Sequence, residues 1–122
     1  MTVLLSIKPE FAYKIFDGSK RYEYRRTIFA KSGVKKVIVY VSHPIRSVIG
    51  EFKIAEILYD DIHSLWTRTK PHAGISENKF LDYFKNKPRG YAIRVKSTRM
   101  YRNPLPLASL MVSSAPQSFM YL

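Results

Sequence analysis

The beginning of the chain changes from the pattern of a strand to the pattern of a helix. Residues 3–7 form a short and almost continuous apolar run, which is typical of a strand. Pro9 suits the first position of a helix, because its fixed φ fits there and its missing N–H is not needed. Apolar residues then recur at helical spacing until Gly18, a residue that favours a helix end. The sequence therefore predicts a strand at 3–7 and a helix from Pro9 to Gly18.

Several later segments have the alternation, or the valine and isoleucine content, that is typical of strands: residues 22–27, 34–42, 48–58 and 91–96. Turn-forming residues separate them, including a Lys-Ser-Gly turn at 31–33, His43-Pro44, and a turn at 87–90. Gly50 interrupts the third of these segments. A glycine inside a strand marks either a bulge or a place where another group approaches the backbone closely.

Two helices are predicted between the last two strands. Either Asp60 or Asp61 can cap the first, whose apolar side carries Ile62, Leu65 and Trp66. Ser76 can cap the second, whose apolar side carries Phe80, Leu81 and Phe84. Strands that follow one another without intervening helices indicate a mostly antiparallel sheet or small barrel. We therefore predict an α+β, mainly β fold, with helices packed on the outside or at the ends of a small β-barrel.

Residues 103–122 differ from the rest of the chain because they contain no charged side chain. Their three prolines and four serines rule out a membrane span. We expect this tail to pack on the domain, with a helical turn near 107–111, so that residues 1–122 form one domain. A tail that binds a partner is the alternative. The expected docking side chains are Leu105, Leu107, Leu110, Met111, Phe119, Tyr121 and Leu122.

Net charge is the property of the composition that says most about the partner of this protein. The 122 residues contain 21 Lys and Arg against 9 Asp and Glu, a formal net charge of +12. This excess exceeds what solubility requires of a small domain, so it favours a nucleic-acid partner over a merely solubilising surface. No metal, cofactor or membrane surface is predicted, since the three histidines lack ligand spacing and cysteine is absent. The lack of cysteine and of a signal-peptide pattern leads us to expect a cytoplasmic protein.

Candidate chemistry is concentrated in residues 18–26, where lysine and arginine side chains surround two tyrosines and one carboxylate. Cations hold phosphate, tyrosine rings stack on unpaired bases, and a carboxylate accepts hydrogen bonds from a base edge. The alternative is structural: the tyrosines belong to the core, and Glu23 pairs with Arg21 or Arg25 on a solvated face. The pattern of residues alone leaves both interpretations open. The candidate nucleic-acid-binding residues are Lys20, Arg21, Tyr22, Glu23, Tyr24, Arg25, Arg26, Ser42 and His43.

The opening strand and helix, followed by Gly18, Lys20, Glu23 and Arg25 in the pattern G-x-K-x-x-E-x-R, resemble the ASCH domain family. Later blocks extend the similarity over nearly the whole chain: residues 40–44, 49–52, the Trp66 helix, 90–93 and 116–119. The resemblance implies a PUA-like barrel with a cleft beside the G-x-K segment that receives RNA. It favours binding of single-stranded RNA or of a nucleotide base. Strict strand alternation separates Lys20 from Glu23, so they share a cleft only if Lys20 precedes the strand.

Enzymatic alternatives accompany the resemblance. Some short ASCH proteins remove the acetyl group from N4-acetylcytidine with a Lys, a Thr three residues later and a downstream Glu. Lys20 matches the lysine, but Glu23 stands at the Thr position, and a carboxylate is a poor substitute for a hydroxyl nucleophile. Other members are ribonucleases. If this chain is an enzyme, Lys20 and Glu23 are its candidate catalytic residues. A protein-interaction module in transcription or translation regulation is the third possibility.

Overall fold

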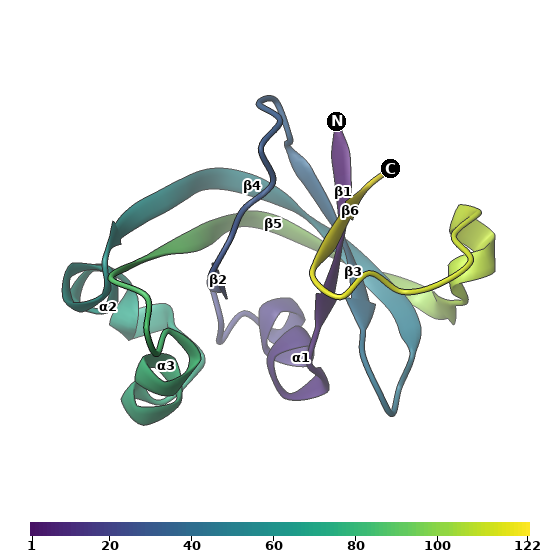
Figure 1. Cartoon of the computed structure of the whole chain (residues 1–122). Coiled ribbons are helices and arrows are strands. Elements are labelled where there is room, and N and C mark those ends of the chain that lie inside the picture. The colour runs from purple at the N-terminus through teal and green to yellow at the C-terminus, as the bar shows by residue number, and fades with distance from the viewer.

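The fold is a six-stranded sheet that curls into a half-barrel, as the computed structural model of residues 1–122 shows (Figure 1). The strands lie in the order β2-β5-β4-β3-β1-β6, and β1 with β3 forms the one parallel pair. The mixed α+β fold with a curled sheet and flanking helices is therefore confirmed. The strands are β1 (Thr2–Ile7), β2 (Tyr22–Arg25), β3 (Lys36–Val41), β4 (Ser47–Asp61), β5 (Arg89–Leu105) and β6 (Phe119–Tyr121).

All three predicted helices form, namely α1 (Pro9–Asp17), α2 (Ile62–Thr69) and α3 (Glu77–Tyr83). Gly18 ends α1 in the left-handed conformation, with φ of 86°. Asp61, rather than Asp60, caps α2 by accepting a hydrogen bond from the Ser64 N–H. The Ser76 hydroxyl caps α3 in the same way, because these side-chain oxygens satisfy N–H groups that have no partner within the helix. None of the helices is long and apolar enough to cross a membrane.

Strand β5 is much longer than the predicted 91–96, and β4 extends to Asp61 rather than ending at residue 58. They pair from Asp61 opposite Arg89 to Val48 opposite Leu105, with register shifts on the way. Most of their length is exposed on one or both sides and therefore lacks the apolar signal of a buried strand. Gly50 lies at one register shift, and a Cβ atom there would come within 2.7 Å of the Phe16 ring. Both expected reasons for this glycine are thus confirmed.

Three apolar clusters hold the elements together. The largest lies inside the curl of the sheet and includes Ala12 and Ile15 of α1. The second lies under α2 and α3 and is centred on Phe80 and Phe84. Leu81 is predicted to share that apolar face, but it is 48% exposed. Phe80 and Phe84 pack into the second cluster, and Leu81 does not belong to it. The third cluster lies under the tail.

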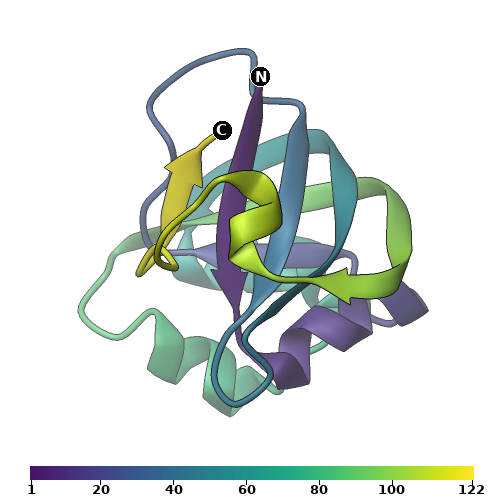
Figure 2. The ribbon, with the colours of Figure 1, turned by 90° about the vertical axis from the view of Figure 1, so that its right-hand side faces the viewer.

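The uncharged tail returns along the sheet, as the view in Figure 2 shows. A short 3₁₀ helix, η2 (Leu107–Leu110), packs over the third cluster, and β6 then pairs antiparallel with β1. Two of the expected docking residues are exposed instead: Leu122 is 45% exposed, and Met111 is 96% exposed. It has a positive φ of 59° at the end of η2, and the neighbouring Val112 is buried instead. The tail thereby completes one end of the sheet beside β1.

Candidate functional site

A cleft of about 520 Å³ lies beside β2, the terminal strand at one end of the sheet, and reaches β1 and the segment before β6 at the other end. Its lining has four cationic side chains and a single carboxylate, Glu23, so the cleft suits an anionic ligand. The lining residues are Ser6, Ile7, Lys8, Phe11, Lys20, Glu23, Tyr24, Arg25, Arg26, Thr27, Ser42, Ile75, Tyr83, Gln117 and Ser118.

Lys20 lies before the first residue of β2, so it escapes the alternation of the strand and shares the cleft with Glu23. The residue is only 2% exposed, and its Nζ donates a hydrogen bond of 2.8 Å to the Ala73 carbonyl. The same ammonium lies 4.6 Å from the centre of the Tyr24 ring. Burial disfavours the charged form and lowers the Lys20 pKa to about 8, although the nearby Glu23 charge opposes this shift. Lys20 is thus a buried amine whose pKa is lowered from its ordinary value toward neutral pH.

The segment that covers Lys20 has little freedom to change. Gly74 has a positive φ of 64°, and a side chain at that position would collide with the aliphatic part of Lys20. Ala73, which accepts the lysine hydrogen bond, is itself buried. Residues between α2 and α3 therefore fix the direction of an amine that comes from a segment 53 positions earlier in the chain.

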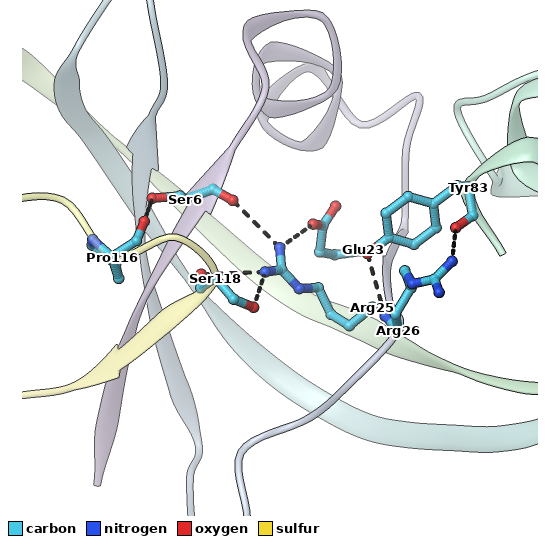
Figure 3. A network of polar contacts seen from close by, with 7 residues as sticks. All are labelled: Ser6, Glu23, Arg25, Arg26, Tyr83, Pro116 and Ser118. Carbon is cyan, nitrogen blue, oxygen red and sulfur yellow. Dashed lines mark hydrogen bonds and ion pairs between the residues drawn. The ribbon is translucent and has the colours of Figure 1, made fainter. Parts of the chain in front are cut away.

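Glu23 and Arg25 form a buried ion pair, with Nη1 of Arg25 3.1 Å from Oε2 of Glu23. The remaining N–H groups of Arg25 reach across the gap between the two ends of the sheet (Figure 3). They donate to the Ser6 carbonyl at 3.3 Å, to the Ser118 carbonyl at 3.2 Å and to the Ser118 hydroxyl at 2.6 Å. Arg25 therefore links β2 to β1 and to the start of β6, and it also orients the Glu23 carboxylate.

Arg26 is held from α3 and the loop that follows it. Its Nη1 donates to the Lys85 carbonyl at 2.9 Å. The same Nη1 donates to the Tyr83 carbonyl at 2.8 Å, and the Tyr83 hydroxyl accepts a bond from the Arg26 main-chain N–H (Figure 3). Both acceptors are uncharged, so no carboxylate neutralises this guanidinium. Arg26 is therefore a cation available to a phosphate at the edge of the cleft.

Tyr24 lines the cleft but belongs mainly to the second apolar cluster. Only 5% of it is exposed, and its ring contacts Phe80 edge-on at 5.0 Å. Its hydroxyl donates to the Thr69 hydroxyl at 2.7 Å, and burial raises the Tyr24 pKa to about 12. This ring gives Lys20 an apolar wall and leaves little surface on which a base can stack.

Strand β2 is the last strand of the sheet, so one of its edges has no neighbouring strand. The Arg21 carbonyl accepts from the Val95 N–H at 2.9 Å, so it points toward β5. In an antiparallel pair the hydrogen-bonding residues alternate along the strand, so the N–H and carbonyl of Tyr24 point the other way. The Arg26 N–H follows the same alternation and reaches Tyr83 on that side. An N–H and a carbonyl side by side match the donor and acceptor pattern of a base edge.

Six of the nine sequence-predicted binding residues line this cleft: Lys20, Glu23, Tyr24, Arg25, Arg26 and Ser42. The other three lie outside it. Arg21 is exposed and its main-chain N–H donates to the His72 carbonyl, whereas Tyr22 packs against the second cluster. His43 lies in the turn after β3, where its Nδ1 is 3.0 Å from Arg46. Of the two partners considered for Glu23, the structure selects Arg25.

Sequence reasoning missed several lining residues that come from distant segments. Ser6, Tyr83 and Ser118 stand in a strand, a helix and a loop that carry no local sign of a site. Ser118 lies in block 116–119, which resembles the ASCH family, and this resemblance was the one signal that could have pointed to it. The others become neighbours of Arg25 and Arg26 only when the sheet curls.

The chain is similar over nearly its whole length to a known protein and to a solved structure. It is 32% identical over 123 residues to an ASCH domain-containing ribonuclease of Zymomonas mobilis, covering 98% of this chain and 82% of that protein. The crystal structure of ASCH from Zymomonas mobilis matches with a TM-score of 0.90 at 30% identity, over 99% of this chain and 87% of that one. No protein-family model matches the chain.

Two other relatives are much longer proteins from Ureaplasma parvum. The chain is 31% identical over 122 residues to ATP synthase subunit alpha and 30% identical over 123 residues to large ribosomal subunit protein uL22. Although 99% of this chain is aligned in each case, it spans only 15% and 39% of their lengths. The similarity therefore concerns one part of each of those proteins.

Proposed function

Because this chain belongs to the ASCH domain family and has its PUA-like fold, we propose that it is a ribonuclease that binds single-stranded RNA in the cleft beside β2. The observation that carries this proposal is the placement of Lys20, a buried amine with a pKa near 8, among arginines that suit phosphate. The similarity to the Zymomonas ribonuclease over nearly the whole chain supports the same conclusion.

The proposed reaction is an internal transesterification of RNA. The ribose 2′-oxygen forms a bond to the adjacent phosphorus, and the bond from phosphorus to the 5′-oxygen of the next nucleotide breaks. A base accepts the 2′-hydroxyl proton and an acid supplies a proton to the leaving 5′-oxygen. The products are a 2′,3′-cyclic phosphate and a 5′-hydroxyl end. The lining supplies the base and the cations near the phosphate, and a water molecule supplies the proton that the leaving 5′-oxygen takes up.

Lys20 in its neutral form is the proposed general base. A catalytic base works best when its pKa lies near the operating pH, and burial brings Lys20 to about 8. Arg26 and the exposed Lys8 hold the phosphates, because neither is paired with a carboxylate. The Ser118 hydroxyl accepts from Arg25 and keeps its own hydrogen for a phosphate oxygen. Glu23 and the main chain of Tyr24 contact the base.

Cleavage of a labelled single-stranded RNA tests the proposal. We expect a cyclic phosphate product from RNA and none from an oligonucleotide of the same sequence with 2′-O-methyl groups. Lys20→Met, purified identically, should lose activity and remain folded by circular dichroism, and wild-type activity should rise up to about pH 8 and then level off. Cleavage of the 2′-O-methyl strand, or full activity in Lys20→Met, would contradict the mechanism.

RNA binding without cleavage is the second candidate function. It is favoured by the internal hydrogen bonds of Lys20 and Arg25, which engage both cations before any ligand arrives. In that case wild type should bind single-stranded RNA and leave it intact at every pH. Such a result would keep the cleft as a binding site and remove the catalytic role of Lys20.

A further inference from the structure

A second groove, of about 310 Å³, adjoins the first cleft where β2 ends. Arg26 and Thr27 line both cavities, so the two are continuous around this short segment. Ile28 of the segment after β2 also lines the groove, and the rest of the lining comes from the end of β4, the turn before β5 and the start of β5: Tyr59, Lys87, Pro88, Arg89 and Tyr91.

Two tyrosine rings form one wall of this groove. Tyr59 and Tyr91 are directly opposite each other on β4 and β5, and their rings stack with centres 4.5 Å apart and an angle of 28°. Tyr59 is 50% exposed, which distinguishes it from the buried Tyr24. Tyr91 stacks on the Tyr59 ring and the Arg89 guanidinium lies over the same ring, so the ring is held between them. An unpaired base can extend this layered group by stacking on the planar guanidinium that Tyr59 supports, at low cost in side-chain entropy.

Cations surround the two rings. The Arg89 guanidinium lies 4.7 Å from the centre of the Tyr59 ring, and Arg26 and Lys87 complete the lining, which has no carboxylate. Two acidic groups lie near Arg89. Asp60 is 4.0 Å from Arg89 but only 3.0 Å from Arg68, and Asp61 lies opposite Arg89 on β4. Arg26 and Lys87 form no ion pair with a carboxylate and give the groove its positive charge. Stacking surfaces next to cations are what proteins use to bind single-stranded nucleic acid without sequence preference.

We propose that this groove, at Tyr59, Tyr91 and Arg89, holds a nucleotide that neighbours the one in the first cleft. The inference rests on the proposed function, because it extends the path of the same RNA strand. Arg26 is then the shared contact for the phosphate between the two nucleotides. The groove adds affinity for longer strands and selects little between bases, since every base offers a face for stacking.

Affinity as a function of strand length tests the inference. The probes are 2′-O-methyl oligouridylates of one, two, four and eight nucleotides, which cannot be cleaved by 2′-oxygen attack. We expect wild type to bind the longer probes more tightly than uridine monophosphate. Tyr59→Ala should weaken binding of the eight-nucleotide probe by about fivefold or more, as for the loss of a base stack, and leave binding of the monophosphate unchanged. Tyr59→Phe, which keeps the ring, should bind as wild type does.

Control measurements separate the groove from charge and from stability. Tyr13→Ala removes a 40% exposed tyrosine of α1 outside both cavities and should change nothing. Arg89→Ala should weaken binding of the eight-nucleotide probe and leave binding of the monophosphate unchanged. This second variant keeps the test independent of the folding of Tyr59→Ala. Photocrosslinking of wild type to a 4-thiouridine strand should place a crosslink at Tyr59 or Tyr91.

The outcomes distinguish this inference from the proposed function. If wild type binds RNA but Tyr59→Ala and Arg89→Ala bind every length as wild type does, the groove proposal is overturned and the cleft remains. If wild type neither binds nor cleaves any RNA, the proposed function fails and the groove proposal fails with it. Equal competition by a polyglutamate peptide would show that the groove recognises charge alone, which also overturns the nucleotide subsite.

Discussion

Arg25 and Ser118 are 93 positions apart in the chain, yet Nη2 of Arg25 donates a 2.6 Å hydrogen bond to the Ser118 hydroxyl. This contact crosses the gap between the terminal strand β2 and the other end of the half-barrel. The motif arginine is therefore part of the scaffold that closes the cleft as well as part of its lining. Changes at Arg25 will affect folding and binding together, so an exposed cation of the cleft such as Lys8 is a better site for separating the two.

Replacement of Glu23 should lower the free energy of unfolding, because Glu23 forms a buried ion pair with Arg25. Glu23→Gln leaves the Arg25 guanidinium buried without its carboxylate, and we expect a loss of about 3 kcal/mol in the free energy of unfolding. The matched control is Glu10→Gln, which breaks the pair with Lys79 on the surface, where both side chains are at least half exposed. That change should cost no more than about 1 kcal/mol. Urea denaturation measures both, and equal losses would mean that Glu23 is not held as described.

Base preference should respond to Glu23 separately from stability. If the carboxylate accepts a hydrogen bond from a base, Glu23→Gln should change the ranking among homopolymers of the four bases. Fluorescence anisotropy at a temperature where the variant is fully folded gives this ranking. An unaltered ranking, with RNA binding retained, would restrict Glu23 to its structural pairing with Arg25.

The lowered pKa of Lys20 predicts an unusual dependence of stability on pH. Folded Lys20 releases its proton near pH 8, whereas the unfolded lysine keeps it to about 10.5, so between these values the unfolded state binds more protons. Stability contributed by this group therefore rises with pH through that window, by roughly 3 kcal/mol in total. Below pH 8 both states are protonated and the full cost of burying the charge is present.

Comparison with Lys20→Met isolates this group from the tyrosines that titrate at higher pH. The stability of wild type relative to the variant should be constant below about pH 8 and should increase toward pH 10.5. Chemical denaturation at several pH values measures the difference. A difference that does not change with pH would show that Lys20 keeps an ordinary pKa in the folded protein.

Salt dependence should report the number of phosphates that the cleft neutralises. The slope of log affinity against log salt is about −0.7 for each phosphate contact to a single strand. Lys8→Ala removes an exposed cation of the cleft and should flatten the slope by roughly that amount. Lys53→Ala removes the same charge from β4 outside both cavities and should leave the slope unchanged. A slope near zero in wild type would exclude RNA as the ligand of this cleft.

Hydrolysis of N4-acetylcytidine should be absent. Glu23 stands where deacetylating relatives place a threonine hydroxyl, and its carboxylate is already engaged by Arg25. Chromatography after incubation of the nucleoside with wild type should show unchanged substrate. Release of cytidine that Lys20→Met abolishes would overturn this expectation and would reassign the cleft to amide cleavage.

The sequence alone determined the local elements, because their signals lie within a few residues of each other. Pro9 and Gly18 set the bounds of α1, Ser76 set the start of α3, and Gly50 marked the bulge in β4. It also determined the family, through the spacing of Gly18, Lys20, Glu23 and Arg25. The far ends of β4 and β5 escaped prediction because exposed strands lack the apolar alternation on which such predictions depend.

Only the tertiary structure decided what the motif residues contact. Lys20 is a buried amine because the Tyr24 ring and Ala73 enclose it, and Ala73 comes from a segment 53 positions away in the chain. Arg25 is a bridge because the curl of the sheet brings Ser6 and Ser118 to it. Burial and long-range contacts set the pKa of Lys20 and the partners of Arg25, and neither property is encoded in the spacing of neighbouring residues.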